Sequence, residues 1–386
     1  MRLHGHVHPE FWPVARALAR QLRRGRRGGA AVCVYHRGEC VVDIWGGAKD
    51  AAGTPWQADT MSVSFSTTKG VTATALHILV DRGLLDYDDP VAKYWPEFAQ
   101  AGKERITVRH LLCHQAGLYG IRGLVDDVRQ LRDWGYMTDA LARAAPAMPP
   151  GTASAYHGFT YGWLVGEVIQ RELAEPLELD GLYIGAPTAQ FPRAARLLMA
   201  TKGTTSASFE MRLRRLQRVL SALRIRFDVN RMIDALLPPG VETFEFDAPE
   251  TLAASIPAAN GLFTARSLAK LYAALAAGGQ WQGRRLLSET TLARATEVQT
   301  RRMDLVVPFP LHWRLGYHRA VTMRGTPPRG FGHYGFGGSG AWADPDRQLA
   351  VALVLNSGIG TPFGDLRTVQ IGGVALQCAT RADKQR

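Results

Sequence analysis

The chain has 386 residues, of which 46% are apolar and 21% are charged. This balance is ordinary for a globular protein, and the length exceeds the ~100–200 residues of a typical single core. The formal net charge of +12 comes from an excess of arginine, which outnumbers lysine by 39 to seven. The arginines lack base-reading or stacking residues beside them, so we expect no nucleic-acid partner.

Arginine gathers most densely in residues 23–27 and 212–226. Both segments are helix-like and partly apolar, which leaves peripheral membrane contact open as a weaker alternative. The four cysteines are scattered, without a CxxC pair or a Cys/His spacing that suits zinc. The first residues lack the apolar core of a signal peptide, and no later segment has the length of a membrane span. We therefore expect a cytoplasmic protein.

The first 60 residues combine a helix with strands. Residues 11–22 place apolar side chains on one helical stripe with arginines opposite, and residues 30–47 are typical of a hairpin around residues 36–39. A further helix is predicted from near Ser66 to about Arg82, with Gly83 as its C-cap. From there to about residue 300 the apolar pattern is mostly helical.

After residue 310 the pattern returns to strands. Strands are predicted at 313–318, 331–335, 340–344 and 349–356, followed by a closing helix at 364–378. Strands at both ends with helices between them predict an α+β fold, in which the termini share one antiparallel sheet flanked by helices. We assign residues 1–60 and 305–386 to a discontinuous sheet-plus-helix domain, and residues 61–304 to a mostly helical domain.

Ser66 and Lys69 lie three residues apart at the start of the predicted helix at 66–82. On a helix, residues at this spacing share one face, so both side chains would point into the same space. A serine hydroxyl is a nucleophile only when a base takes its proton, and lysine is such a base if burial keeps it neutral. The alternative is an N-cap serine with a solvated lysine. Ser267 and Lys270 match the same spacing, so spacing alone does not choose between the two pairs.

The context of Ser66 provides the choice. Its surroundings read SFSTTKG, followed by ALHILVDRGLLDYDDPVAKYWPEF and ITVRHLLCHQAGL, and the C-terminal part reads HYGFGGSGAWADPDRQLAVALVLN. These segments resemble the serine β-lactamase and penicillin-binding-protein superfamily, above all its class C-like members and the family VIII carboxylesterases. The resemblance covers nearly the whole chain and implies a β-lactamase/transpeptidase-like fold with its active site between the two domains. It also implies that the helix of Ser267 is not catalytic.

The resemblance implies a tyrosine that enters the site from the helical domain, at Tyr156 in PPGTASAYHGFTYGWLVGEVI. Pro149-Pro150-Gly151 predicts a turn, so Tyr156 is expected on a loop before a helix. A phenol close to a lysine ammonium can be pushed toward phenolate and can then carry protons to the leaving group or from water. The alternative for Tyr156 is an ordinary core tyrosine.

A strand motif is the third element that the resemblance implies, here His333-Tyr334-Gly335. A glycine lets the backbone approach a substrate closely. The backbone N–H groups of Ser66 and Phe336 would form the oxyanion hole. Gly335 would border the substrate, although the glycines here could simply make a tight hairpin.

Two departures from the family's pattern bear on the substrate. Tyr156-His157-Gly158 lacks the asparagine that penicillin-recognising members carry, and His333 replaces a cationic lysine. At its ordinary pKa near 6.5, histidine is charged for only part of the time at neutral pH. Both departures weaken β-lactam recognition more than acyl transfer. We treat His157 and His333 as candidate substrate contacts.

The sequence therefore predicts a serine hydrolase that acts on short-acyl carboxylic esters through Ser66, Lys69 and Tyr156, without a metal or other cofactor. A β-lactamase or D-amino-acid peptidase is the alternative with the same site. A non-catalytic scaffold or membrane-associated protein is the alternative of another class. The expected partner is a small-molecule ester, and the sequence predicts no oligomeric state.

Three further groups of residues have spacings that suggest metal or cation sites, and none is predicted to be a functional site. His110 and His114 have the i, i+4 spacing of a two-histidine metal site on a helix, but the glutamate of HExxH is missing. The carboxylates at 86–89 suit a turn, and the histidines at 4, 6 and 8 suit at most adventitious metal. The arginine-rich segment 201–239 is a hypothetical lid that sets acyl-chain preference.

Overall fold

The computed structural model of the chain describes residues 2–23, 28–167, 180–198, 211, 214, 215, 217, 218, 221, 222, 228–358 and 366–385. One large antiparallel sheet has the strand order β1-β3-β2-β12-β11-β10-β9, which brings both ends of the chain together. Its strands are β1 (His4–Val7), β2 (Gly29–His36), β3 (Glu39–Gly47), β9 (His318–Arg319), β10 (Phe331–Tyr334), β11 (Gly340–Asp344) and β12 (Leu349–Leu355). The α+β fold with a central antiparallel sheet is confirmed.

Two small sheets and the helices complete the described architecture. The small sheets are β4-β6-β5 (Ser62–Val63, Leu262–Phe263, Leu182–Tyr183) and β7-β8 (Gln280–Trp281, Arg284–Arg285). The α-helices are α1 (Trp12–Arg23), α2 (Thr67–Asp81), α3 (Val108–Leu112), α4 (Trp134–Arg143), α5 (Thr160–Gly166), α7 (Val229–Leu236), α8 (Pro249–Ala253), α9 (Ala265–Ala276), α10 (Glu289–Thr296) and α11 (Leu366–Lys384). The 3-10 helices are η1 (Pro9–Phe11), η2 (Val91–Lys93), η3 (Pro96–Phe98), η4 (Val128–Arg132), η6 (Thr188–Arg193), η7 (Val241–Thr243) and η8 (Phe336–Gly338).

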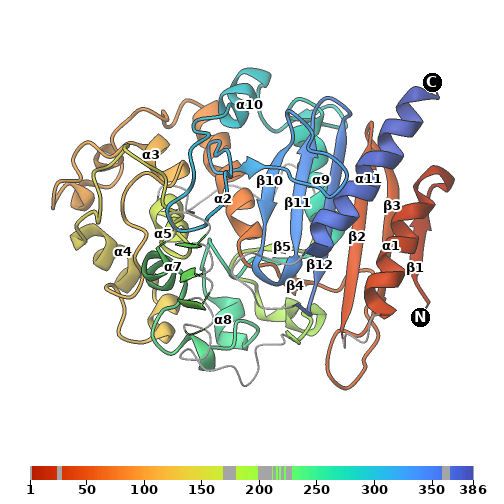
Figure 1. The fold of residues 1–386 in the computed structure, drawn as a ribbon, viewed down its shortest axis with the longest axis horizontal. Coiled ribbons are helices and arrows are strands. Elements are labelled where there is room, and N and C mark those ends of the chain that lie inside the picture. The colour runs from red at the N-terminus through yellow and green to blue at the C-terminus, as the bar shows by residue number, and fades with distance from the viewer. Residues whose placement is uncertain are drawn as a thin grey trace.

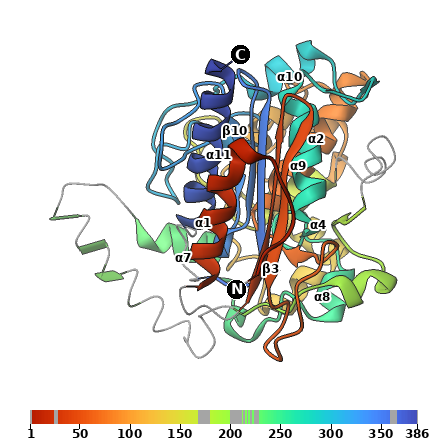
Figure 2. The same ribbon diagram turned by 90° about the vertical axis from the view of Figure 1, so that its right-hand side faces the viewer.

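Helices cover both faces of the large sheet. Helices α1 and α11 lie side by side over one face, and α9 lies over the other (Figure 2). Strand β2 is therefore buried along its whole length, and its successive side chains enter different cores. Val32 packs with the α1 and α11 side, whereas Cys33 packs with the α9 side. This explains the unbroken apolar run of β2. The domain boundaries at residues 60 and 305 stay a prediction. Helix α9, which belongs to the predicted helical domain, packs on the large sheet.

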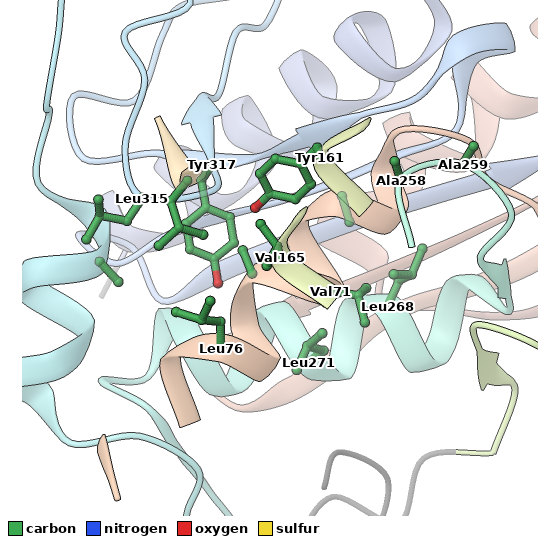
Figure 3. Packing of buried hydrophobic residues seen from close by; sticks show 14 of the residues in the cluster. Val71, Leu76, Tyr161, Val165, Ala258, Ala259, Leu268, Leu271, Leu315 and Tyr317 are labelled. Carbon is green, nitrogen blue, oxygen red and sulfur yellow. The ribbon is translucent and has the colours of Figure 1, made fainter. Parts of the chain in front are cut away.

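Helix α2 lies between the sheet and the helices α3, α4, α5 and α7 (Figure 1). Every residue from Thr67 to Val80 is buried, and Val71 and Leu76 pack among side chains of α5 and α9 (Figure 3). Gly70 is required for this packing, because a Cβ there would lie 2.2 Å from the Tyr272 hydroxyl of α9. The predicted helix at 66–82 is confirmed, and Gly83 follows it with a φ of +72°.

Two local predictions were wrong. The strand expected at 313–318 is limited to His318–Arg319, since Gly316 has a φ of +74° and Arg314 N–H donates back to Tyr317 O. His110 and His114 do not share a helix face, because α3 ends at Leu112 and His114 has a φ of +58°. In the described part of the chain, no group of three or more metal-ligating side chains could hold a metal ion.

The arginine-rich segment has only a short described part. Helix α7 (Val229–Leu236) lies at its end, whereas most of 201–220 and all of 223–227 lie outside the described residues. In the N-terminal arginine cluster, the described residues likewise exclude arginines 24, 26 and 27. The lid hypothesis thus stays a prediction. Within the described ranges, no helix has both the length and the apolar character that crossing a bilayer requires.

Candidate active site

Ser66 stands directly before α2, and its hydroxyl takes no part in capping the helix. The N-caps of α3 and α4, Thr107 and Asp133, do accept hydrogen bonds from their helices, as N-caps usually do. Phe65 turns the chain into the helix with a φ of +46°, a conformation that is strained for a bulky residue. The Ser66 hydroxyl is therefore available to side chains rather than to the backbone of the helix.

Lys69 lies one turn into α2 and is 0% exposed. Its Nζ lies 2.7 Å from Gly158 O, 2.9 Å from Ala258 O and 3.2 Å from Ser66 Oγ. No carboxylate of the described residues pairs with it. Burial therefore lowers the pKa of Lys69 well below its ordinary value.

This geometry suits a neutral lysine. A neutral amine has two N–H groups and one lone pair, and the two carbonyl oxygens accept the two N–H groups. The lone pair is then directed at the third neighbour, the Ser66 hydroxyl, which can donate its proton. Lys69 is thus placed as the base that serine chemistry requires.

Tyr156 reaches the site from a loop before α5, as its position after the Pro-Pro-Gly turn predicts. Its hydroxyl donates to Ser66 Oγ over 2.7 Å, and the Lys69 Nζ lies 5.0 Å from its ring centre. Burial raises the pKa of Tyr156, and the hydrogen bond to Ser66 offsets this only partly. The idea that a lysine ammonium pushes Tyr156 toward phenolate was wrong for the resting site, since burial disfavours both charges. The phenol begins as a proton donor.

Gly335 brings the end of β10 against the start of α2. A Cβ at Gly335 would lie 2.2 Å from Ser64 O and 2.9 Å from Thr67 Oγ1. Its N–H donates to Ser339 O over 2.7 Å, which fixes the turn that carries Phe336. Neither the Ser66 N–H nor the Phe336 N–H has a hydrogen-bond acceptor among the described residues. Both donors of the predicted oxyanion hole are therefore free of backbone acceptors in the described structure, and the hole itself stays a prediction.

The two candidate histidines differ in what they contact. His157 is enclosed by backbone, with Nδ1 2.7 Å from Ala155 O and Nε2 accepting from Leu118 N–H over 3.2 Å. Its ring therefore supports the Tyr156 loop. His333 bonds Tyr334 O through Nδ1, while its Nε2 has no described partner. Burial lowers the pKa of both histidines, so neither supplies a cation at neutral pH.

The second serine and lysine pair has a different environment. Ser267 lies in the first turn of α9, where its hydroxyl bonds Thr264 Oγ1 and donates to Asp180 O. Lys270 is partly exposed, with its Nζ 5.8 Å from the Trp281 ring centre. The spacing is the same, but the chemistry of the Ser66 pair is absent.

Apolar groups surround the polar atoms of the site. Phe65 makes edge contacts with Phe336 and Phe246 on one side of Ser66, at ring-centre distances of 5.4 and 5.2 Å. On the other side, Tyr156 packs in a cluster with Val229 and Met232 of α7. The surroundings of the nucleophile are thus aromatic and aliphatic.

Sequence reasoning missed four groups of the site. The carbonyls of Gly158 and Ala258 hold Lys69, and backbone atoms leave no trace in a residue pattern. Asp304 and Trp313 contact Tyr156. The one available signal was a lone carboxylate in the otherwise apolar run MDLVVPFPL, which leads to Trp313.

Comparison with known proteins agrees with this geometry. A family model described as Beta-lactamase matches residues 14–376. The chain is 41% identical over 371 residues to the esterase/beta-lactamase LipL of Mycobacterium tuberculosis, covering 92% of this chain and 83% of LipL. A crystal structure of a family VIII carboxylesterase superposes with a TM-score of 0.85 at 34% identity, covering 98% of this chain and 100% of that one.

A penicillin-binding-protein homolog from Caulobacter crescentus gives the same TM-score of 0.85, at 34% identity and with coverage of 98% and 100%. The similarities extend over nearly the whole chain and include the segments that carry Ser66, Tyr156 and Gly335. The resemblance that the motifs indicated is thereby confirmed. The chain belongs to the serine β-lactamase family and is a hydrolase of that family.

Proposed function

We propose that the protein hydrolyses carboxylic esters through an acyl-enzyme on Ser66. One observation carries the proposal: Ser66 Oγ lies within hydrogen-bond reach of both Lys69 Nζ, at 3.2 Å, and Tyr156 OH, at 2.7 Å. Burial favours the neutral amine of Lys69, which can act as a base, and the neutral phenol of Tyr156, which can act as an acid. Their opposite roles follow from environment, since burial lowers the pKa of the lysine and raises that of the phenol.

In acylation, Lys69 takes the proton of the Ser66 hydroxyl while Oγ bonds to the ester carbonyl carbon. The Ser66 and Phe336 N–H groups receive the negative oxygen that develops. The bond to the alcohol then breaks, and Tyr156 gives its proton to the leaving oxygen. The proton that Lys69 took restores the phenol.

In deacylation, water attacks the acyl carbon. Lys69 accepts the proton of the water, the bond between the acyl carbon and Ser66 Oγ breaks, and Oγ takes that proton as the acid leaves. Atoms and charge balance without an added cofactor.

The substrate class follows from the groups around the serine. The aromatic side chains of Phe65, Phe246 and Phe336 favour a neutral, apolar acyl group, and its short length stays the expectation from the sequence. His333 is buried and neutral, and Gly158 stands where an asparagine would bond an acylamino side chain. Both features support an ester over a β-lactam carboxylate. The named activity of the family VIII carboxylesterase supports the same choice, whereas LipL is named for both activities.

The β-lactamase and peptidase alternative uses the same serine. It predicts that a chromogenic cephalosporin is opened at a rate that rivals ester hydrolysis. The non-catalytic scaffold alternative predicts that a serine-reactive phosphonate leaves the protein unlabelled. The contacts of Ser66 with Lys69 and Tyr156 count against the scaffold.

The test is hydrolysis of p-nitrophenyl butyrate at mildly alkaline pH by wild type, Ser66→Ala and Ser267→Ala. We expect Ser66→Ala to lose activity by at least about 10³-fold, because the nucleophile is removed. Ser267→Ala is the matched control and should keep its turnover. An inactive wild type, or full activity in Ser66→Ala, would refute the proposal.

A further inference from the structure

A buried carboxylate stands behind Tyr156 without a role in the reaction described above. Asp304 is 5% exposed and lies on the segment between α10 and β9. Its Oδ1 accepts from the backbone N–H groups of Tyr156, Val306 and Val307 over 3.1, 2.8 and 3.0 Å. Its Oδ2 accepts from the Trp313 indole over 3.0 Å. Four N–H groups therefore converge on one side chain.

Trp313 is the second part of this arrangement. Its ring is 1% exposed and lies nearly parallel to the Tyr156 phenol, with 9° between the planes and 5.8 Å between the centres. Three histidine rings also contact the indole, with the ring centre of His114 at 4.3 Å, that of His318 at 6.1 Å and that of His333 at 6.3 Å. Asp304 thus holds both the backbone of Tyr156 and the ring that flanks its phenol.

The environment of Asp304 is costly for a carboxylate. No cation of the described residues pairs with it, and burial raises its pKa to about 6 in spite of the four N–H groups. An apolar residue of similar size would avoid this desolvation, but it would leave four buried N–H groups unbonded. The anion also acts on Tyr156 directly, because its charge raises the pKa of the phenol. Asp304 therefore fixes the position of Tyr156, and its charge adds to burial, which is the main cause of the raised pKa of the phenol.

We propose that Asp304, together with Trp313, is a positioning residue that holds the protonated Tyr156 phenol at Ser66 for transfer of its proton to the leaving alcohol. The inference rests on the proposed function, since it assigns that transfer to Tyr156. Loss of the carboxylate should then lower kcat/KM for esters whose leaving group needs a proton. It should spare esters whose leaving group departs as an anion.

The experiment compares kcat/KM of Asp304→Asn on ethyl butyrate and on p-nitrophenyl butyrate, which share one acyl group. Values are taken per active site, counted by titration with a serine-reactive phosphonate. We expect the loss on ethyl butyrate to exceed the loss on p-nitrophenyl butyrate by about tenfold, part of the ~10²–10⁴ that a general acid contributes. A merely structural role would lower the number of active sites or both rates alike, and an unchanged ratio overturns the proposal.

Three further variants make the outcome unambiguous. Tyr156→Phe should show the same selective loss to a greater degree, and if it does while Asp304→Asn does not, the proposed function stands and the role of Asp304 fails. If Asp304→Asn does not fold, Trp313→Phe decides the matter by the same ratio, since it keeps a ring and deletes the indole N–H. Asp344→Asn is the control, because that carboxylate is buried on β11 and bonds Arg347. Its ratio should equal that of wild type.

Discussion

At the scale of single residues, two buried lysines show what makes Lys69 a base. Lys103 is also 0% exposed, and its Nζ lies 2.9, 2.9 and 2.6 Å from the carbonyl oxygens of Gln100, Ala142 and Ala144. Three acceptors call for three N–H groups, and only the ammonium has them. Lys69 has two carbonyl neighbours and one hydroxyl, and the hydroxyl can donate as well as accept. The exchange of one carbonyl acceptor for a serine hydroxyl is thus what distinguishes the proposed base from a structural lysine.

The buried Lys69 also makes stability depend on pH. Between its lowered folded-state pKa and its ordinary value, the unfolded chain holds a proton that the folded chain lacks, so stability rises with pH. We expect the unfolding free energy of wild type, measured relative to Lys69→Met, to rise by up to about 1.4 kcal/mol per pH unit in this range. Urea unfolding at several pH values measures it. Lys270→Met, at a partly exposed lysine, should run parallel to wild type, and a parallel Lys69→Met curve would contradict the prediction.

At the scale of elements, the site depends on how closely β10 approaches the start of α2. We expect Gly335→Ala to lower kcat/KM by about 10²–10³-fold, the usual cost of losing one oxyanion donor. The added Cβ would meet Ser64 O, and the strand must move away and take the Phe336 N–H with it. Ester kinetics and circular dichroism together check this. Gly123→Ala is the matched control because no atom lies within 4 Å of its Cβ. Wild-type kinetics in Gly335→Ala would show that β10 does not position the donor.

The elements also show what a sequence can predict. Helix α2 and strand β12 were predictable because each is buried along nearly its whole length. Such burial requires a largely apolar run of residues, which is visible in the sequence. The contact between Ser66 and Lys69 was predictable from one helical turn together with the family resemblance, and their catalytic roles stay a proposal. Asp304 and Trp313 lie in an irregular segment without a period, and they meet Tyr156 only through the tertiary fold. The strand at 313–318 failed for the same reason, since a left-handed glycine overrides an apolar run there.

At the scale of the whole molecule, one buried core connects the sheet to the helices around the site. This core contains Cys33 of β2, Val71 of α2, Leu164 of α5, Leu268 of α9 and Ala352 of β12. Ser66 directly precedes α2, and Lys69 lies on it. Tyr156 precedes α5, and Gly335 follows β10. The reacting groups therefore belong to elements that share this core or border it. Their geometry should persist as long as the core does.

This arrangement predicts that activity and global structure are lost together on heating. We expect the midpoint of far-UV circular dichroism to coincide with that of esterase activity after brief heating, because the elements that carry the reacting groups share this core or border it. Leu268→Ala removes a fully buried side chain of α9 and should destabilise both readouts equally, by about 2–5 kcal/mol. Lys270→Ala on the same helix is the control, with an expected change within about 0.5 kcal/mol. Activity that disappears well below the structural transition would show instead that the segments carrying Tyr156 and Gly335 unfold as a separate unit.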